Sequence, residues 1–154
     1  MSKTKKAIKL KVRIPHVILD ARNADPALVA KLSEGLDSLD ARFRILGPEM
    51  KGVELAYAFS VEEALEESHI WVVLGKELPA EFNMIAERGI IPVALRGVNK
   101  DLENYNPVGE CGNSFLFPKS SAWSIYGTLV RALENFNFTY DWKNLQSEVK
   151  SLTV

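Results

Sequence analysis

Short apolar segments alternate with helical segments along most of this 154-residue chain. The segments "HVILDA" (16–21), "HIWVVLG" (69–75) and "IIPVAL" (90–95) are apolar enough to form strands that are covered on both faces. Helical spacing lies between them, for example where Leu28 and Val29 are followed by Leu32. This alternation predicts an α/β fold, with helices wound over both faces of a mostly parallel sheet.

Local signals mark where several elements begin and end. Asp25 before Pro26 predicts a capping residue followed by the first residue of a helix. Ser60 and Glu63 have the spacing of a capping box, and Gly89 suits the left-handed end of a helix. We therefore expect helices that begin after residues 25 and 60 and one that ends near residue 89.

Three further segments are candidates for strands. "RFRILG" (42–47) and "SFLF" (114–117) read as strands, whereas "VELAYAF" (53–59) is either a strand or an irregular connection. Pro92 lacks a backbone N–H, which predicts that it lies in an edge strand or at the start of a strand. The tryptophans Trp71, Trp123 and Trp142 are expected in the core.

The first 14 residues differ from the rest of the chain. They carry only basic charges, at Lys3, Lys5, Lys6, Lys9, Lys11 and Arg13. Apolar residues alternate with these cations from residue 8 onward, which favours an edge strand over an arm that binds phosphates or acidic lipid. We expect a basic arm or edge strand over 1–14, followed by a single domain over 15–154.

Composition excludes several classes of function. The formal net charge of −1 gives no reason to expect a nucleic-acid partner. No apolar run approaches the roughly 20 residues that a membrane span needs. A single cysteine, Cys111, excludes an internal disulfide and a multi-cysteine metal site. We expect a cytoplasmic protein with no metal and no bound cofactor.

In a parallel α/β sheet, ligands bind at the carboxyl ends of the strands, so three loops are candidates. The loop after "HVILDA" offers Asp20, Arg22 and Asn23, but it has no glycine that would let backbone donors approach a phosphate. The loop after "WVVLG" brings Lys76 and Glu77 to the mouth of a buried strand.

The loop after "WVVLG" and the third candidate loop, which follows "IIPVAL", each have two competing interpretations. Lys76 suits a phosphate and Glu77 a sugar hydroxyl or a general base, whereas acids before a helix also simply complement its dipole. The loop after "IIPVAL" contains Arg96, Gly97 and Lys100, the best anion-binding chemistry in the chain. The alternative there is a solvated loop. His16 and His69 are expected to have a packing or surface role rather than a catalytic one.

The order of the segments, more than any one motif, resembles a known family. The segments are "IPHVILDARNADPALVAKLSEGL", "ARFRILG", "VEEALEESHIWVVLGKELPAEFNMIAERGIIPVALRG", "GNSFLF", "IYGTLVRALENF" and "DWKNL". Together, over roughly residues 16–146, they resemble the C-terminal, donor-binding half of GT-B glycosyltransferases, and "GNSFLF" is similar to an element of the glycogen and starch synthase branch. The resemblance implies a Rossmann-like domain that binds a nucleotide-diphosphate sugar.

The chain departs from that family where the family binds its donor. The donor-contacting glutamate would fall at Lys76, with Glu77 one residue away, and the paired glycines that follow the Pro-Val strand (90–95) in the family shrink to Gly97. The phosphate-binding loop that opens the family's C-terminal half is absent or reduced. We therefore favour a non-catalytic relative that serves binding or assembly.

Two other interpretations stay open. The first is a donor-binding subunit that works with a separate chain resembling the N-terminal half, or by self-association; Lys76, Glu77, Arg96 and Lys100 would contact the nucleotide sugar, and Glu77 would be the catalytic candidate. The second is a flavodoxin-like regulatory domain, which is weakened because no acidic pair follows the first strand.

Overall fold

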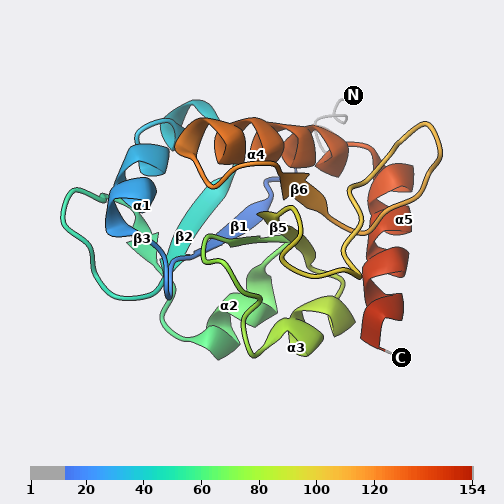
Figure 1. Ribbon diagram of the computed structural model, residues 1–154, viewed down its shortest axis with the longest axis horizontal. Helices are drawn as coiled ribbons and strands as arrows, with labels where there is room; N and C mark the ends of the chain where they lie inside the picture. Colours follow the sequence, from blue (N-terminus) through green and yellow to red (C-terminus); the bar gives the residue numbers. More distant parts are fainter. Residues whose placement is uncertain (1–12, 154) are drawn as a thin grey trace, which may run out of the picture.

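The computed structural model describes residues 13–153, which form a six-stranded, fully parallel sheet covered by helices (Figure 1). The strands lie in the order β3-β2-β1-β4-β5-β6. Their bounds are β1 His16–Asp20, β2 Arg42–Leu46, β3 Ala56–Tyr57, β4 Ile70–Val73, β5 Ile91–Leu95 and β6 Phe115–Phe117. This is the strand order of a doubly wound, Rossmann-like fold, so the predicted α/β fold class is confirmed.

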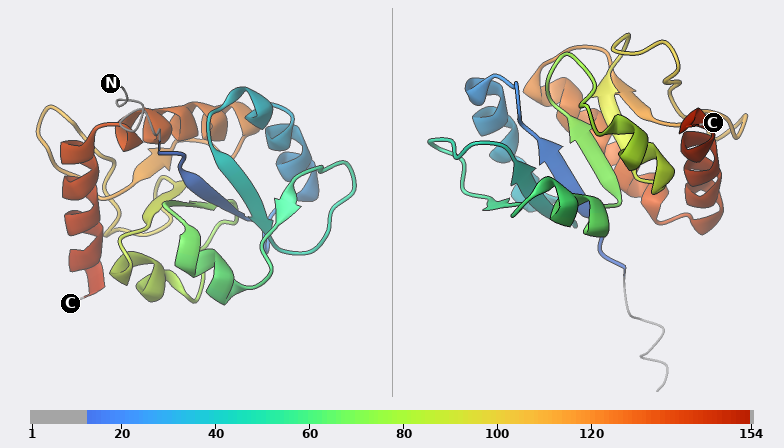
Figure 2. Two further views of the ribbon diagram at one scale, coloured as in Figure 1. Left: turned by 180° about the vertical axis from the view of Figure 1, so that it is seen from behind. Right: turned by 90° about the horizontal axis from the view of Figure 1, so that it is seen from below.

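Helices cover both faces of the sheet, as the views from behind and from below show (Figure 2). The α-helices and short 3-10 turns are α1 Pro26–Ser33, η3 Leu36–Ser38, α2 Val61–Glu67, α3 Phe82–Glu87, α4 Ala122–Phe136, α5 Thr139–Lys150 and η4 Ser151–Thr153. One core cluster joins α1, α4 and α5 to the sheet, and the other joins α2 and α3 to its opposite face.

The central strands β1 and β4 contribute side chains to both core clusters, because successive side chains of a strand point to opposite faces of the sheet. Val17 and Leu19 pack toward α1 and α4, whereas Ile18 and Trp71 pack toward α2 and α3. All four side chains are almost fully buried. A strand in this position must be apolar along its whole length, which is why the runs at 16–21 and 69–75 were readable in the sequence.

The predicted helix boundaries are confirmed by their capping contacts. The Asp25 side chain accepts a hydrogen bond from Ala27 N at 3.1 Å, and Pro26 is the first residue of α1. Ser60 Oγ accepts from Glu63 N at 3.1 Å, while Glu63 Oε1 accepts from Phe59 N rather than from Ser60 N. The second half of the capping box is therefore shifted by one residue.

Pro92 lies in an interior strand, yet it leaves no bond of the sheet unmade. Ile91 N donates to His69 O at 3.0 Å, so the next nitrogen, that of Pro92, faces the opposite side of β5. On that side β6 begins only opposite Val93. The proline therefore occupies the start of an interior strand, where no partner requires its N–H.

A tight turn precedes β6, whose three residues are all buried. Gly112 has φ +107°, and a Cβ at this position would lie 2.5 Å from Tyr105 Cα and 2.6 Å from Asn104 O. Asn113 ties the turn down, since its side chain accepts from Glu103 N at 2.9 Å and donates to Asp101 O at 3.0 Å. Only glycine fits where two loop segments approach this closely.

The three tryptophans differ in their burial. Trp71 and Trp142 are buried as predicted, but the prediction for Trp123 is wrong, because 80% of this residue is exposed. Trp123 lies in the first turn of α4, on the outer side of the helix, where its side chain faces neither core cluster. "VELAYAF" forms only the two-residue strand β3.

The N-terminal prediction falls mostly outside the described residues. Residues 1–12 are not described, so the basic arm or edge strand stays a prediction. The first described residue, Arg13, places its guanidinium carbon 4.3 Å from the centre of the Phe136 ring. No helix within residues 13–153 is long and apolar enough to cross a membrane.

Candidate functional site

The direction in which the chain builds its sheet reverses between β1 and β4. From β1 the chain adds β2 and β3 on one side, and it then returns to add β4, β5 and β6 on the other. The loops after β1 and β4 therefore diverge, which opens the crevice where ligands bind in sheets of this kind. A cleft of about 670 Å³ lies there, lined mainly by residues from 20–28 and 73–81. We call it the switch-point cleft.

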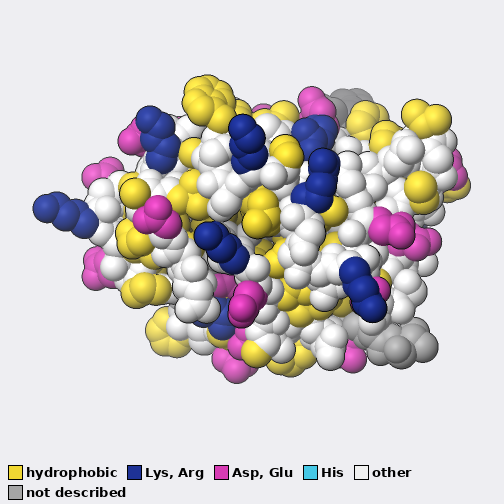
Figure 3. Space-filling model, viewed as in Figure 1, with side chains coloured by type: hydrophobic (Ala, Val, Ile, Leu, Met, Phe, Trp, Pro, Cys, Tyr) yellow, Lys and Arg dark blue, Asp and Glu magenta, His cyan; other side chains and the backbone are white. Residues whose placement is uncertain are grey.

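Acidic side chains outnumber basic ones in the switch-point cleft. Among the described residues that line it, four are carboxylates and two are cations: Asp20, Asp25, Glu77 and Glu81, with Arg22 and Lys76. Figure 3 shows that lysines and arginines are scattered over the face viewed in Figure 1, with acids between them. The lining of the cleft therefore presents no strongly basic field to an anion.

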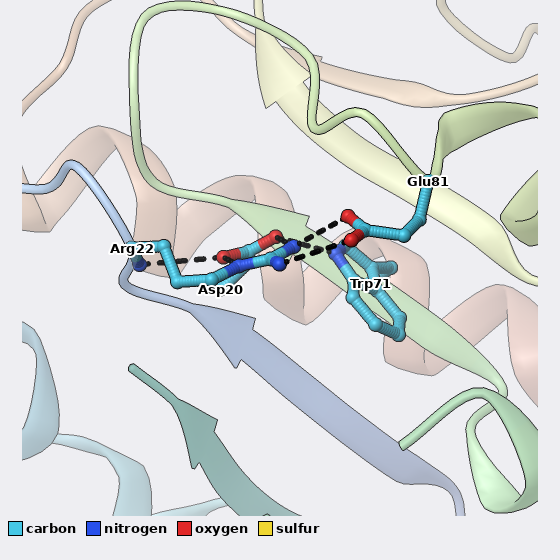
Figure 4. Close-up of polar contacts among 4 residues, drawn as sticks. All are labelled: Asp20, Arg22, Trp71 and Glu81. Carbon is cyan, nitrogen blue, oxygen red and sulfur yellow. Dashed lines mark hydrogen bonds and ion pairs between the residues drawn. The ribbon is translucent and has the colours of Figure 1, made fainter. Parts of the chain in front are cut away.

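Arg22 is held between two carboxylates that come from different elements (Figure 4). Its Nε and one terminal nitrogen donate to Asp20 Oδ1 and Oδ2 at 3.0 and 2.9 Å. Its terminal nitrogens also donate to Glu81 Oε1 and Oε2 at 3.0 and 3.3 Å. Arg22 thus joins the end of β1 to the start of α3 across the cleft, through two bidentate ion pairs.

Asp20 is the anchor of this network because it is the last residue of β1 and only 3% exposed. A buried carboxylate needs several donors to stay in place. In addition to Arg22, the indole Nε1 of Trp71 donates to Asp20 Oδ2 at 3.0 Å. The neighbouring strands β1 and β4 place Asp20 and Trp71 on the same side of the sheet, so the backbone itself positions this contact.

The ion pairs change the pKa values of two members. The hydrogen bond to Asp20 is the main reason that the pKa of Arg22 is raised, although burial opposes the change. The hydrogen bond from Arg22 is the main reason that the pKa of Glu81 is lowered. Both groups therefore stay charged at neutral pH, and the ion pairs persist.

The amino end of α1 also faces this cleft, and it too is occupied by the protein's own groups. A helix amino end binds anions through its free N–H groups. Here Pro26 has no N–H, and the N–H of Ala27 donates to the Asp25 carboxylate. An incoming phosphate would therefore meet a carboxylate where other Rossmann-like folds offer donors.

The sequence-predicted site residues fall into two groups. Lys76 and Glu77 are exposed and line the switch-point cleft, together with Arg22 and Glu81. Arg96, Gly97 and Lys100 follow β5 instead; they are exposed and do not line the cleft. Gly97 forms a turn with φ +88°. The structure thus brings the residues of the first two loops together and leaves the third loop apart.

Sequence reasoning missed how these residues are connected. Arg22 was visible as a cation in a loop, but its pairing with Glu81 spans 59 positions in the chain. Trp71 was visible as a core residue, but not as a hydrogen-bond donor to a carboxylate. A signal was present, since Asp20 is an acid at the end of a fully apolar run and such a residue needs a buried partner.

The side chain of His69 is half-buried and packed, in line with the packing role predicted for it. His69 Nδ1 accepts from His16 N at 2.9 Å, and the His69 ring packs against Phe136 with ring centres 4.9 Å apart. Burial is the main cause that lowers the pKa of His69. Within residues 13–153, no group of three or more His, Cys, Asp or Glu side chains is arranged to hold a metal ion.

Comparison with known proteins gives a partial similarity. No protein-family model matches the chain. Over 65 residues, or 41% of its length, the chain is 32% identical to "Glycogen synthase 1" of Synechocystis sp.. The matched stretch covers 14% of that protein, so the chain spans only a small part of its length. The similarity indicates a glycosyltransferase-like relationship and agrees with the α/β fold.

Proposed function

We propose that this chain is a glycosyltransferase-like domain that transfers no sugar by itself and acts as a binding or assembly module. The observation that carries the proposal is the pairing of Arg22 with both Asp20 and Glu81 in the switch-point cleft. A nucleotide-diphosphate sugar needs cations or free N–H groups around its phosphates. In this cleft the protein's own carboxylates already occupy the arginine.

The donor count of the guanidinium makes this argument quantitative. An arginine has five N–H donors in a fixed plane. Four contacts from Arg22 reach the oxygens of Asp20 and Glu81. One N–H of Arg22 is left, so a phosphate can form a bidentate contact with Arg22 only after at least one of these carboxylates leaves, and the freed carboxylate would then repel the phosphate at short range.

Sugar transfer makes a further demand on such a site. When a nucleotide-sugar bond breaks, negative charge develops on the departing diphosphate, and catalysis depends on stabilising that charge. Lys76 is the remaining cation among the described residues of the cleft, and Glu77 follows it directly. A single exposed lysine beside a carboxylate is a weak source of such stabilisation.

A second candidate is a donor-binding subunit that works with a separate chain carrying an N-terminal-half-like domain. The similarity to a glycogen synthase and the position of Lys76 and Glu77 in the cleft favour it. In this case Lys76 would contact a phosphate, Glu77 would be the catalytic candidate, and Arg96 and Lys100 would approach the donor from the third loop. The ion pair between Arg22 and Glu81 would have to open on binding.

The test is a calorimetric titration and a thermal-unfolding screen with UDP, ADP, UDP-glucose and ADP-glucose. Ligand at a hundred times its dissociation constant stabilises a native protein by roughly 2.7 kcal/mol, which is a shift of several degrees at this size. We expect neither heat nor shift at millimolar ligand. Binding that is lost in Lys76→Ala, and weakened in Arg96→Ala or Lys100→Ala, would reject the proposal in favour of the donor-binding subunit. An unmodified glycogen synthase is the positive control for the ligands.

A further inference from the structure

A second hollow lies between α1, η3 and the first turns of α4. Its volume is about 350 Å³, and Trp123 and Tyr126 form its aromatic walls. It shares no lining residue with the switch-point cleft. We call it the α1–α4 groove.

One of the two aromatic side chains is largely open to solvent. Trp123 and Tyr126 are three positions apart on α4, and their rings meet edge to face, with centres 6.2 Å apart and planes at 73°. Tyr126 is held back against Gly35, where an added Cβ would lie only 3.2 Å from its ring. Trp123 is 80% exposed, so its indole stands as an open platform beside the groove.

Polar groups surround this platform. Ser38 Oγ and the Tyr126 hydroxyl are 2.8 Å apart and share a hydrogen bond at the groove wall. Lys31 and Glu34, both exposed and close to the end of α1, complete the rim with one positive and one negative charge. The groove therefore combines a flat apolar surface with donors and acceptors around it, and it carries no net charge of its own.

We infer that the α1–α4 groove binds a neutral sugar ring, as part of an oligosaccharide. A pyranose has C–H groups on its faces and hydroxyl groups around its edge, so its polarity matches this arrangement. The C–H face would lie on the indole of Trp123, and the hydroxyls would reach Ser38, Lys31 and Glu34. The volume is in the range of small-molecule sites, about 300–1,000 Å³.

Two other occupants fit the groove less well. A protein interface buries more than about 1,000 Å² around an apolar centre, whereas here a single indole is surrounded by exposed polar residues such as Lys31, Glu34 and Ser121. A nucleic-acid base also stacks on indole, but its backbone needs a positively charged groove, and here Lys31 is balanced by Glu34. A neutral polyhydroxyl ligand needs neither.

The inference is tested by tryptophan fluorescence of the full chain, titrated with maltoheptaose and, separately, with cellohexaose. Trp71 and Trp142 are buried, so a ligand in the groove acts mainly on the emission of Trp123. We expect a saturable change in emission at low millimolar concentration with at least one of the two sugars. The difference between them reports which linkage geometry the platform accepts.

Variants separate the groove from the rest of the surface. Trp123→Ala should weaken binding, read by calorimetry, at least about tenfold, and Trp123→Phe by a smaller factor. Gly35→Ala should also weaken binding, because the backbone there accepts alanine (φ −96°) while the methyl group displaces Tyr126. Phe59→Ala is the matched control, since Phe59 is 91% exposed and lies outside the groove.

Three outcomes would overturn the inference. They are an absence of binding to both sugars, binding that survives in Trp123→Ala, and a Trp123-dependent dimer in sedimentation, which would assign the groove to a second copy of the chain. Circular dichroism of each variant confirms that its fold is retained. Because the groove and the switch-point cleft are separate, a negative result here leaves the nucleotide titration unaffected, and the reverse also holds.

Discussion

The switch-point cleft and the α1–α4 groove each contain a tryptophan, and the two tryptophans are used in opposite ways. Trp71 is fully buried, and its indole N–H donates to Asp20 beneath the cleft. Trp123 is 80% exposed and contacts another aromatic ring at the edge of the groove. The cleft is polar, and its arginine is paired with two of the protein's own carboxylates, whereas the groove exposes an apolar ring.

This difference shows that the position of a hollow in the fold does not establish its use. The cleft lies where Rossmann-like sheets bind nucleotides, yet Asp20, Asp25 and Glu81 occupy the groups that would hold phosphates. The groove lies on a helical layer that has no such general role, yet it exposes an aromatic side chain to solvent. Site chemistry, rather than fold, therefore has to decide function.

The largest expected effect comes from breaking the cleft network at its anchor. Asp20→Asn replaces a buried carboxylate by an amide and leaves the charge of Arg22 without its main partner. Removing one member of a buried ion pair costs about 3 kcal/mol or more. We expect a loss of about 3 kcal/mol in the free energy of unfolding, measured with urea.

The control for this variant is Asp37→Asn, at an exposed acid in η3. We expect a change within about 0.5 kcal/mol there. If Asp20→Asn were no more destabilising than Asp37→Asn, the network would not be the structural device described above, and Arg22 would be available to a ligand.

Trp71→Phe should have the next largest effect. The substitution removes the indole N–H that donates to Asp20 and leaves a small cavity at a residue with 0% exposure. The lost hydrogen bond and the cavity together predict a destabilisation of about 2 kcal/mol. Urea unfolding measures it, and a loss below about 0.5 kcal/mol would mean that Asp20 does not depend on the indole.

Much of the fold could be predicted from the sequence because the signals for its strands and helix ends are local. The apolar runs at 16–21 and 69–75 gave β1 and β4, and Asp25, Ser60 and Gly89 marked helix ends that the structure confirms. These signals depend on neighbours within a few residues in the chain. The general rules for parallel α/β sheets then restrict the topologies that these elements can form.

The site was less readable because its contacts are long-range. The pairing of Arg22 with Glu81 and the burial of Trp71 against Asp20 depend on how β1, β4 and α3 meet, which no local pattern specifies. The prediction that Trp123 is buried was wrong for a different reason, which is local. Tryptophan is usually buried, and the outward direction of one position in the first turn of α4 overrides that tendency.

A smaller effect is expected from Glu81→Gln, and it depends on pH. The pKa of Glu81 is lowered in the folded state, chiefly by the hydrogen bond from Arg22. Its contribution to stability is therefore present above the unfolded pKa and is lost as pH falls through the folded value. At neutral pH we expect the variant to be less stable by under about 1 kcal/mol, because both side chains are partly exposed.

Urea unfolding across about pH 3–7 checks the sign. The wild-type protein should lose more stability than Glu81→Gln as the pH falls below about 5, so that the two curves converge. Glu77→Gln is the matched control, since Glu77 lines the same cleft, whereas the side-chain hydrogen bonds of Arg22 go to Asp20 and Glu81. Parallel curves for the wild-type protein and Glu81→Gln would mean that the ion pair does not persist in solution.

The smallest expected effect on stability is that of Trp123→Phe, and this small value is informative. A substitution at an 80% exposed side chain removes little buried surface, so the free energy of unfolding should change by less than about 0.5 kcal/mol. Acrylamide should quench the wild-type fluorescence much more than that of the variant, since the two remaining tryptophans are buried. A loss comparable to that of Trp71→Phe would show that the indole is packed in solution, and the α1–α4 groove would then have no open platform for a ligand.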